Sequence, residues 1–322
     1  MATTVKDKRF RIDAALSGLA YVAGLYHNID PEGEDADDFL ETMIVIESFL
    51  DNGGVNHRDL VARFRRGRQT RINGKETMSG GNRDERSQMY KLQQSKDPFY
   101  ISRSGFTNGA AMRSMATAFF FPALDEMVYA TNFVASITHE SPESRAAAIA
   151  LAIAYRLALT KDEWSVEEVA AILGSYIPNG SNARHYFDLS FSGNEYHKPS
   201  SLLELTERYG YMHAAISSVP AAIHAAKASW SLTPVEEFFR YPPSRQHQVV
   251  GVDDDKTTEK FIHYLATACT RGMTKRHDAD TYYSMLIPLA MMDEKQHNTK
   301  IYSHQVFERF DNIAEALAAR WP

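Results

Sequence analysis

The sequence predicts an all-α protein, and three observations support this fold class. Apolar residues recur at helical spacing through much of the chain. Residues that cap helices stand just before several of these apolar runs. Alternating runs of β-branched residues between turn signals are almost absent, and no internal repeat is visible. With 322 residues, of which 44% are hydrophobic, the chain can bury a sizeable core.

The helices expected in the first half of the chain have recognisable starts and ends. Apolar spacing predicts a helix from Asp37 to Leu50, which begins with an acidic pair and stops at Asn52-Gly53-Gly54. A turn containing Gly and Asn leads into an apolar helix within 104–122, where we expect Met112 and Phe119–Phe121 in the core. Ser141 as a cap, followed by Pro142, predicts the start of an Ala-rich helix.

Further helices are expected in the second half of the chain. The apolar pattern predicts a helix over 203–228 and an amphipathic helix over 303–321. Between them, Thr257 and Thr258 can cap a helix that runs through Cys269, and the motif HDADT opens another at about Thr281.

Composition excludes several classes of function. One cysteine, Cys269, cannot form an internal disulfide, and no Cys/His spacing suggests zinc, so oxygen ligands are the expected metal chemistry. No run of about 18 apolar residues or secretory signal is visible, so we expect a cytoplasmic protein. A net charge of −6 argues against a surface that binds nucleic acid as a whole, although a local basic patch is allowed.

Three polar segments, 65–98, 178–200 and 241–256, interrupt the helical pattern and are expected to be long surface loops. The start of the first segment overlaps RFRRGRQTR at 63–71, whose arginines could bind phosphates or a nucleic acid. A run of this kind is more often a solvated loop, so both interpretations stay open.

Two acidic motifs carry the residues best suited to bind a metal. They are Asp37-Asp38 and Asp278-x-Asp280-Thr281, each at an expected helix start. If they meet in space, a divalent cation would relieve the repulsion of their carboxylates and could activate water. Each motif alone is more often a pair of helix-capping residues.

Five motifs in sequence order resemble those of the ADP-ribosylglycohydrolase family. DDFLETMIVIESFLDNGG at 37–54 is similar to its acidic helix, with Glu47 and Ser48 in register. TNGAAMR at 107–113 resembles its Gly-Asn-Gly-Ala-Met-Arg turn, and THESPES at 138–144 resembles its Thr-His-x-x-Pro helix start. Residues 210–220 resemble the helix before the last motif, and HDADTYYSMLIPLAM at 277–291 the closing Gly-Asp-x-Asp-Thr helix.

The resemblance implies a compact orthogonal helical bundle, with one domain over 1–322 and insertions near 65–98, 178–200 and 241–256. It also implies a magnesium-dependent hydrolase that cleaves the C1 glycosidic bond of an ADP-ribosylated protein or small molecule. One or two Mg²⁺ ions are implied, with Mn²⁺ as an alternative. The implied metal ligands are Asp37, Asp38, Asp278, Asp280 and Thr281, and catalysis falls to Asp38, Asp37 and Asp280. The implied substrate-binding residues are Thr107, Asn108, Gly109, Ala110, His139 and His277.

The chain departs from the family pattern at several positions. Ala36 replaces the usual hydroxyl residue before the acidic pair, Phe39 replaces the Thr that often follows it, and His277 replaces a glycine. The usual Gly-Asp-Ala of the first helix is missing from 18–28, which leaves Glu32, Glu34 and Asp35 as candidates for a further carboxylate. Two other hypotheses therefore remain: a hydrolase of another ribosyl N-glycoside, and an ADP-ribose-binding protein without catalysis.

Overall fold

The computed structural model is built mainly of helices, as the sequence predicts. It describes residues 4–29, 37–67, 69–72, 75–78, 88–103, 105, 107–181, 183–184, 215–227, 277–292 and 310–322. The helices of the first half are α1 (Val5–Ile29), α2 (Asp37–Asn52), α3 (His57–Arg66), α4 (Gln88–Gln94), the 3-10 helix η1 (Asn108–Arg113), α5 (Ser114–Phe120), α6 (Leu124–Thr138) and α7 (Pro142–Thr160). They are followed by α8 (Val166–Gly174), α11 (Ala215–Lys227), α15 (His277–Met291) and α16 (Phe310–Ala318).

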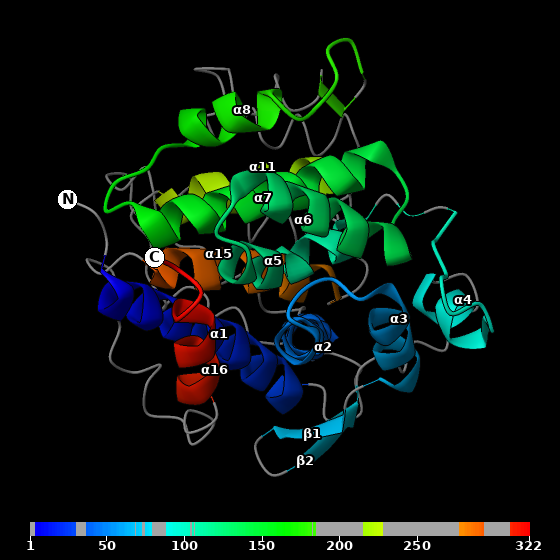
Figure 1. The fold of residues 1–322 in the computed structure, drawn as a ribbon. Helices are drawn as coiled ribbons and strands as arrows, with labels where there is room; N and C mark the ends of the chain where they lie inside the picture. Colours follow the sequence, from blue (N-terminus) through cyan, green and yellow to red (C-terminus); the bar gives the residue numbers. More distant parts are fainter. Residues whose placement is uncertain are drawn as a thin grey trace, which may run out of the picture.

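Helix α7 lies at the centre of the bundle (Figure 1). Its start confirms the predicted cap, because the Ser141 side chain accepts a hydrogen bond of 3.0 Å from the backbone N–H of Ser144 and Pro142 follows at the first position. The helix packs against α5, α6, α8, α11 and η1. Its many alanines let these neighbours approach closely from several sides, so nearly the whole helix is buried.

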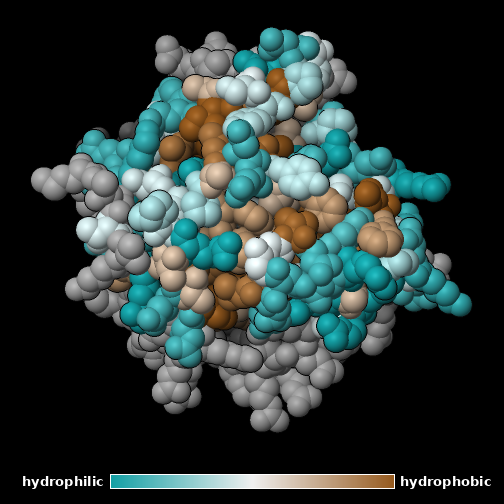
Figure 2. All heavy atoms as spheres, viewed as in Figure 1, coloured by the Kyte–Doolittle hydropathy of each residue, from teal (hydrophilic) through white to brown (hydrophobic). Residues whose placement is uncertain are grey.

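The predicted aromatic core is confirmed. Phe119 and Phe120 are fully buried, Met112 is buried, and Phe121 packs against the same core. On the face seen in Figure 2, hydrophobic residues appear in several groups that hydrophilic residues separate. No described helix is long and apolar enough to cross a membrane.

Helices α1 and α15 lie side by side, although almost the whole chain separates them in sequence (Figure 1). Gly18 makes this contact close. A Cβ atom at this position would lie 3.2 Å from the Cα atom of Pro288 and 3.3 Å from side-chain atoms of Ile287 and Met291. The nearest neighbour is backbone, which cannot turn aside as a side chain can.

We therefore expect Gly18→Ala to destabilise the protein. Alanine favours a helix over glycine by up to about 1 kcal/mol, whereas overpacking a buried contact costs about 1–3 kcal/mol. The cost of overpacking should exceed the gain in helix propensity, so the free energy of unfolding measured in urea should fall by about 1–2 kcal/mol. An increase would show that α15 can move aside without cost.

The terminal segment is attached to the core through Trp321. The indole Nε1–H donates a hydrogen bond of 2.8 Å to the backbone carbonyl of Phe119, and the ring is 5% exposed. Lys8 Nζ lies 5.5 Å from the ring centroid, and the guanidinium of Arg156 lies 5.0 Å from it. Helix α16, the described part of the helix predicted over 303–321, packs on α1 and α5.

The expectation of one long loop over 65–98 is wrong. Arg65 and Arg66 end helix α3, β1 (Gln69–Ile72) pairs antiparallel with β2 (Lys75–Met78), and α4 follows with Leu92 buried. The missed signal was Asn73-Gly74, a dipeptide that favours tight hairpin turns between two short strands. The helix opened by HDADT also begins earlier than expected, at His277.

Several predictions fall wholly or partly outside the described residues. The loop expected over 241–256 and the helix expected from Thr257 through Cys269 lie outside them. Of the loop over 178–200 the structure describes 178–181 and 183–184, and of the helix over 203–228 it describes α11.

Candidate functional site

The predicted acidic pair lies in the first turn of α2. Asp38 is 3% exposed and Asp37 is half-buried, and the backbone N–H of Asp38 donates a 2.9 Å hydrogen bond to Asp37 Oδ1. A carboxylate at a helix start is stabilised by the helix dipole. Thr42 donates to the carbonyl of Asp38 at 2.7 Å and to that of Met112 at 3.2 Å, which holds this turn against η1.

Glu41 adds a third carboxylate one turn further along α2. It accepts a 2.8 Å bond from Arg113 Nη1 in a buried ion pair. Burial raises the pKa of Glu41 to about 7, because the loss of hydration and the nearby charge of Asp37 outweigh the attraction of Arg113. The Glu41–Arg113 ion pair therefore interacts electrostatically with the predicted metal ligands Asp37 and Asp38.

Arg113 is the cation that the described structure places among these carboxylates. It is 1% exposed, its Nη2 donates to Thr138 Oγ1, and its guanidinium lies 5.1 Å from the ring centroid of Phe64. Burial lowers the pKa of Arg113, while the charges of Glu41, Asp37 and Asp38 raise it. Among the described residues, one guanidinium thus interacts with three carboxylates.

The raised pKa of Glu41 predicts a pH-dependent stability. Between its unfolded value of 4.5 and about 7, the folded state binds more protons than the unfolded state. This contribution to stability is complete below pH 4.5 and is lost as pH rises through 7. Relative to Glu41→Gln, the wild type should therefore lose up to about 1.4 kcal/mol of unfolding free energy per pH unit in this interval.

Urea unfolding of both proteins at pH 5, 6, 7 and 8 measures this difference. Glu140→Gln, at an exposed carboxylate on the same molecule, controls for the substitution itself. A wild-type minus Glu41→Gln difference that stays constant across the series would contradict the buried titration.

His139 holds the turn that the sequence predicts to bind substrate. Its Nε2 lies 2.7 Å from Thr107 Oγ1, its Nδ1 lies 2.8 Å from Thr138 Oγ1, and the residue is 9% exposed. A Cβ atom at Gly109 would lie 3.1 Å from the ring, so this glycine lets the turn pack on the imidazole. The predicted substrate role of His139 stays a prediction, but the structure gives it a second task as a support.

The same turn needs Gly105 just before it. Gly105 has φ of +116°, and a Cβ atom there would lie 3.0 Å from the carbonyl oxygen of Thr138. Ser144 at the start of α7 donates to the carbonyl of Thr107 at 3.0 Å. Among the other predicted residues of the turn, Asn108 and Ala110 are buried. Three elements, α6, α7 and η1, therefore position Thr107 to Ala110.

The second acidic motif is placed by its backbone. His277, Asp278, Asp280 and Thr281 form the start of α15, and the side chains of 277–283 lie outside the described residues. Helix α15 packs against both α2 and η1. The fold thus brings together the helices that carry the two motifs, whereas the meeting of their carboxylates stays a prediction.

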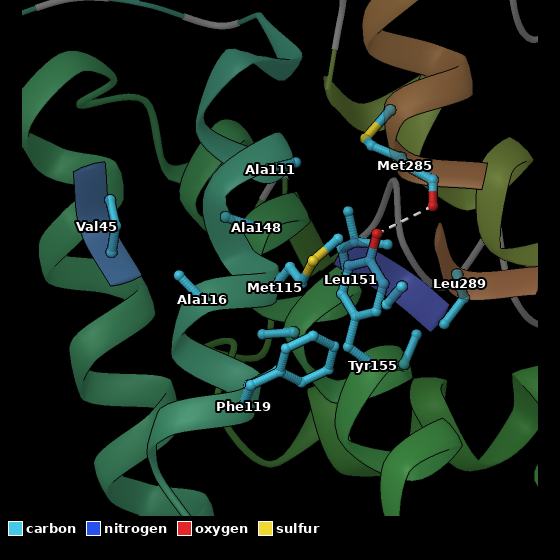
Figure 3. Close-up of a cluster of buried hydrophobic side chains, with 14 of the residues drawn as sticks. Val45, Ala111, Met115, Ala116, Phe119, Ala148, Leu151, Tyr155, Met285 and Leu289 are labelled. Carbon is cyan, nitrogen blue, oxygen red and sulfur yellow. Dashed lines mark hydrogen bonds between the residues drawn. The ribbon is translucent and has the colours of Figure 1, made fainter. Parts of the chain in front are cut away.

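Tyr155 of α7 connects α15 to the core near the acidic pair. Its hydroxyl donates a 3.1 Å bond to the carbonyl of Met285, and its ring packs among buried side chains that include Met115 and Leu151 (Figure 3). Burial, together with the charge of Asp38, raises the pKa of Tyr155 far above its usual range. The hydroxyl therefore stays a neutral donor that helps to hold α15.

The described residues fit a hard divalent cation only in part. Asp37 and Asp38 supply carboxylate oxygens at the start of α2, the type of ligand that Mg²⁺ prefers. Within the described ranges, which leave out the side chains of Asp278 and Asp280, no three His, Cys, Asp or Glu side chains are grouped to hold a metal. A complete ligand set would need the α15 motif.

Two departures from the family pattern have different outcomes. Phe39 packs edge-on against Phe310 of α16, with ring centroids 5.8 Å apart, and is buried in the core. At this position, where the family often has threonine, Phe39 therefore makes a core contact. Ala36, Glu32, Glu34 and Asp35 lie outside the described residues.

In the arginine-rich segment at 63–71, Arg63 and Arg65 make bonds within the protein. Arg63 binds Asp59 at 2.7 Å and Asp51 at 2.6 Å, and Arg65 donates to the carbonyls of Leu92 and Asp97. These bonds indicate that Arg63 and Arg65 stabilise the fold. They do not support a role of these two arginines in binding a nucleic acid.

Sequence reasoning missed Glu41, Arg113, Thr138 and Tyr155. Three signals were available. Glu41 lies four residues after Asp37 and thus on the same helix face, Arg113 ends the TNGAAMR motif, and Thr138 begins the THESPES motif. No comparable pattern marks Tyr155, whose role depends on tertiary contacts.

Comparisons with known proteins agree with this all-α fold. The structure is similar to one solved as an "ADP-ribosylglycohydrolase-related protein complex", with 17% identity, a TM-score of 0.61, and coverage of 98% of this chain and 99% of that one. At this identity the likeness shows the fold. The sequence profile of the ADP-ribosylglycohydrolase family matches residues 3–258. The chain therefore belongs to the ADP-ribosylglycohydrolase family of glycoside hydrolases. No curated protein matches it.

Proposed function

We propose that this protein is a magnesium-dependent hydrolase that cleaves the C1 glycosidic bond of ribose in an ADP-ribosylated protein or small molecule. The observation that carries the proposal is the buried acidic start of α2, where Asp37, Asp38 and Glu41 face Arg113 and the helix of the second acidic motif packs alongside. Membership of the family supports the substrate class.

The proposed reaction gives the acidic residues separate tasks. Asp37, Asp38, Asp278, Asp280 and Thr281 would hold Mg²⁺, which supplies Lewis acidity and fixes the ribose hydroxyls. Asp38 orients a water molecule and takes its proton as the water oxygen bonds to C1 of the ribose. The bond from C1 to the leaving group breaks through an oxocarbenium-like state, and the leaving group gains a proton from solvent while Asp38 returns to solvent the proton that it took. Asp37 and Asp280 stabilise the developing positive charge.

Release of free ADP-ribose tests this proposal. ADP-ribosyl-arginine, ADP-ribosyl-serine and NAD are each incubated with the protein, with magnesium or manganese and with a chelator. We expect release from at least one substrate that a chelator abolishes and added magnesium restores. Release that persists in the chelator would contradict the metal dependence, and the substrate that reacts would identify the bond.

A second candidate function is ADP-ribose binding without catalysis. The burial of Phe39 against Phe310, where the family often has threonine, supports it because one potential oxygen ligand is replaced by a core contact. A protein of this kind would bind ADP-ribose equally well with magnesium and with a chelator, and would release none from the three substrates. Another ribosyl N-glycoside as substrate, and a cytoplasmic location, also stay predictions.

A further inference from the structure

Three of the four large hydrophobic side chains that the described residues expose lie on α6 and on the segment between α4 and η1. They are Phe99 and Ile101, which are 54% and 46% exposed, and Tyr129, which is 67% exposed. The fourth is Phe10 of α1, a helix whose start lies on the other side of the bundle from α4 (Figure 1). A single exposed hydrophobic residue is common, whereas a group of them is typical of an interaction surface.

The segment from 99 to 103 has an outward side and an inward side. Phe99, Ile101 and Arg103 are exposed, whereas Tyr100 between them is half-buried and Ser102 is fully buried. This alternation is that of a strand with one face in solvent. The outward side therefore presents two hydrophobic side chains and one cation in a row.

The inward side of this segment is bound to α3 and α6. The backbone N–H of Ser102 donates a 3.0 Å hydrogen bond to the carbonyl of Ser136, and Nε2 of His57 donates to the carbonyl of Tyr100 at 3.1 Å. Among the described residues, the backbone N–H of Ile101 has no acceptor. A backbone donor between exposed side chains can pair with the backbone of another chain, as an edge strand does.

The Phe99 ring is held in place although more than half of the residue is exposed. Its centroid lies 5.5 Å from that of His57, which packs edge-on against Phe133 at 4.7 Å, and the guanidinium of Arg58 lies 6.0 Å from it. Tyr129 precedes Phe133 by one turn of α6 and so lies on the same helix face. A side chain that is already ordered loses little freedom when it becomes an anchor for a partner.

The charge around these hydrophobic residues is positive. Arg58, Lys96 and Arg103 are exposed, and within the described ranges no carboxylate pairs with them. Asp97 is the one carboxylate of the segment, and its Oδ1 accepts a 2.9 Å bond from the backbone N–H of Phe99. The chain as a whole has a net charge of −6, so this surface differs in sign from the rest and suits an acidic partner.

We infer that an acidic polypeptide with hydrophobic side chains docks on this surface. The docking surface consists of Arg58, Phe99, Ile101, Arg103 and Tyr129. A polypeptide fits it better than a nucleic acid, because the aliphatic Ile101 gives bases no face to stack on and its N–H suits a backbone carbonyl.

The docking surface leads directly to the turn at 107–110. Arg103 lies two residues before Gly105, whose carbonyl accepts a 3.2 Å bond from the N–H of Ser141 at the start of α7. A polypeptide on this surface would thus lie beside the candidate site. We therefore identify the partner as the protein that carries the ADP-ribose, a step that rests on the proposed function, whereas the docking itself does not.

Fluorescence anisotropy with labelled polymers tests the chemistry of the partner. The wild type is titrated against a random copolymer of glutamate and tyrosine, against polyglutamate and polylysine, and against single-stranded oligothymidylate. We expect the copolymer to bind about tenfold more tightly than any of the others. Equal binding of polyglutamate, which would show attraction by charge alone, or tighter binding of oligothymidylate would overturn the inference.

Variants locate the binding. Phe99→Ser, Ile101→Ser and Arg103→Glu should each weaken copolymer binding by about fivefold or more. Phe10→Ser makes the same change at an exposed phenylalanine outside the docking surface and should bind as the wild type does. Circular dichroism and urea unfolding check that each variant is folded. Loss of affinity in Phe10→Ser equal to that in Phe99→Ser would place the binding elsewhere and overturn the inference.

The docking surface and the hydrolase proposal fail in different ways. If the wild type releases no ADP-ribose from any substrate but copolymer binding depends on Phe99, the hydrolase proposal fails and the docking surface is supported. If magnesium-dependent release occurs and the copolymer does not bind, the docking surface fails and the hydrolase stands.

Discussion

Replacement of Asp38 by Asn should lower turnover at least 100-fold while the protein stays folded. The change keeps the size of the side chain and removes the charge that the proposed reaction uses to orient water and to hold Mg²⁺. Asp38 is the more buried member of the pair, so water cannot easily replace its carboxylate. The affinity for magnesium should fall as well, and added metal should recover part of the activity.

Asp51→Asn is a matched control for this prediction. It makes the same change near the other end of α2, at an exposed ion pair with Arg63, where loss of the pair costs less than about 1 kcal/mol. Its turnover should equal that of the wild type. Asp38→Asn turnover within tenfold of the wild type, with circular dichroism unchanged, would count decisively against the proposed role.

Replacement of Trp321 by Ala should reduce the free energy of unfolding by about 3–5 kcal/mol. The indole is 5% exposed, so its removal leaves a cavity beside Phe119, and the hydrogen bond to the Phe119 carbonyl is lost. Two cations, Lys8 and Arg156, also lose the aromatic face that they approach.

Trp321→Phe separates these contributions. It retains much of the packing and the aromatic face and removes the indole donor, so we expect a loss of about 1–2 kcal/mol. Both variants are measured by urea unfolding, with the slope of the transition as a check on two-state behaviour. If Trp321→Ala proved as stable as Trp321→Phe, the terminal segment would contribute little to the core.

The helical framework could be predicted from the sequence because its signals are local. The acidic start and glycine end of α2, and the Ser141 cap before α7, depend on residues a few positions apart. The strands β1 and β2 were missed because they are short and polar, and the dipeptide between them was read as part of a loop. Short elements of this kind owe their stability to pairing, which periodicity does not reveal.

The acidic start of α2 could be predicted from the sequence, but its surroundings could not. The burial of Glu41 against Arg113 joins residues 72 positions apart, and the Tyr155 bond to Met285 joins residues 130 apart. Contacts of such separation leave no periodic trace in the sequence. The motif TNGAAMR predicted the turn before the apolar helix. Only the tertiary structure shows that the His139 side chain contacts this turn at Thr107 and Gly109.

The central place of α7 has a consequence for the order in which the site assembles. Helices α5, α6 and α8 are its neighbours both in sequence and in space, so they can pack on it with little loss of loop entropy. Helices α2 and α15, which carry the acidic motifs, must be brought in from opposite ends of the chain. During refolding, the α5–α8 unit should gain amide protection first, and magnesium affinity should return last. The proposed metal site would then report on late folding, since it forms only after α2 and α15 have both packed into the bundle.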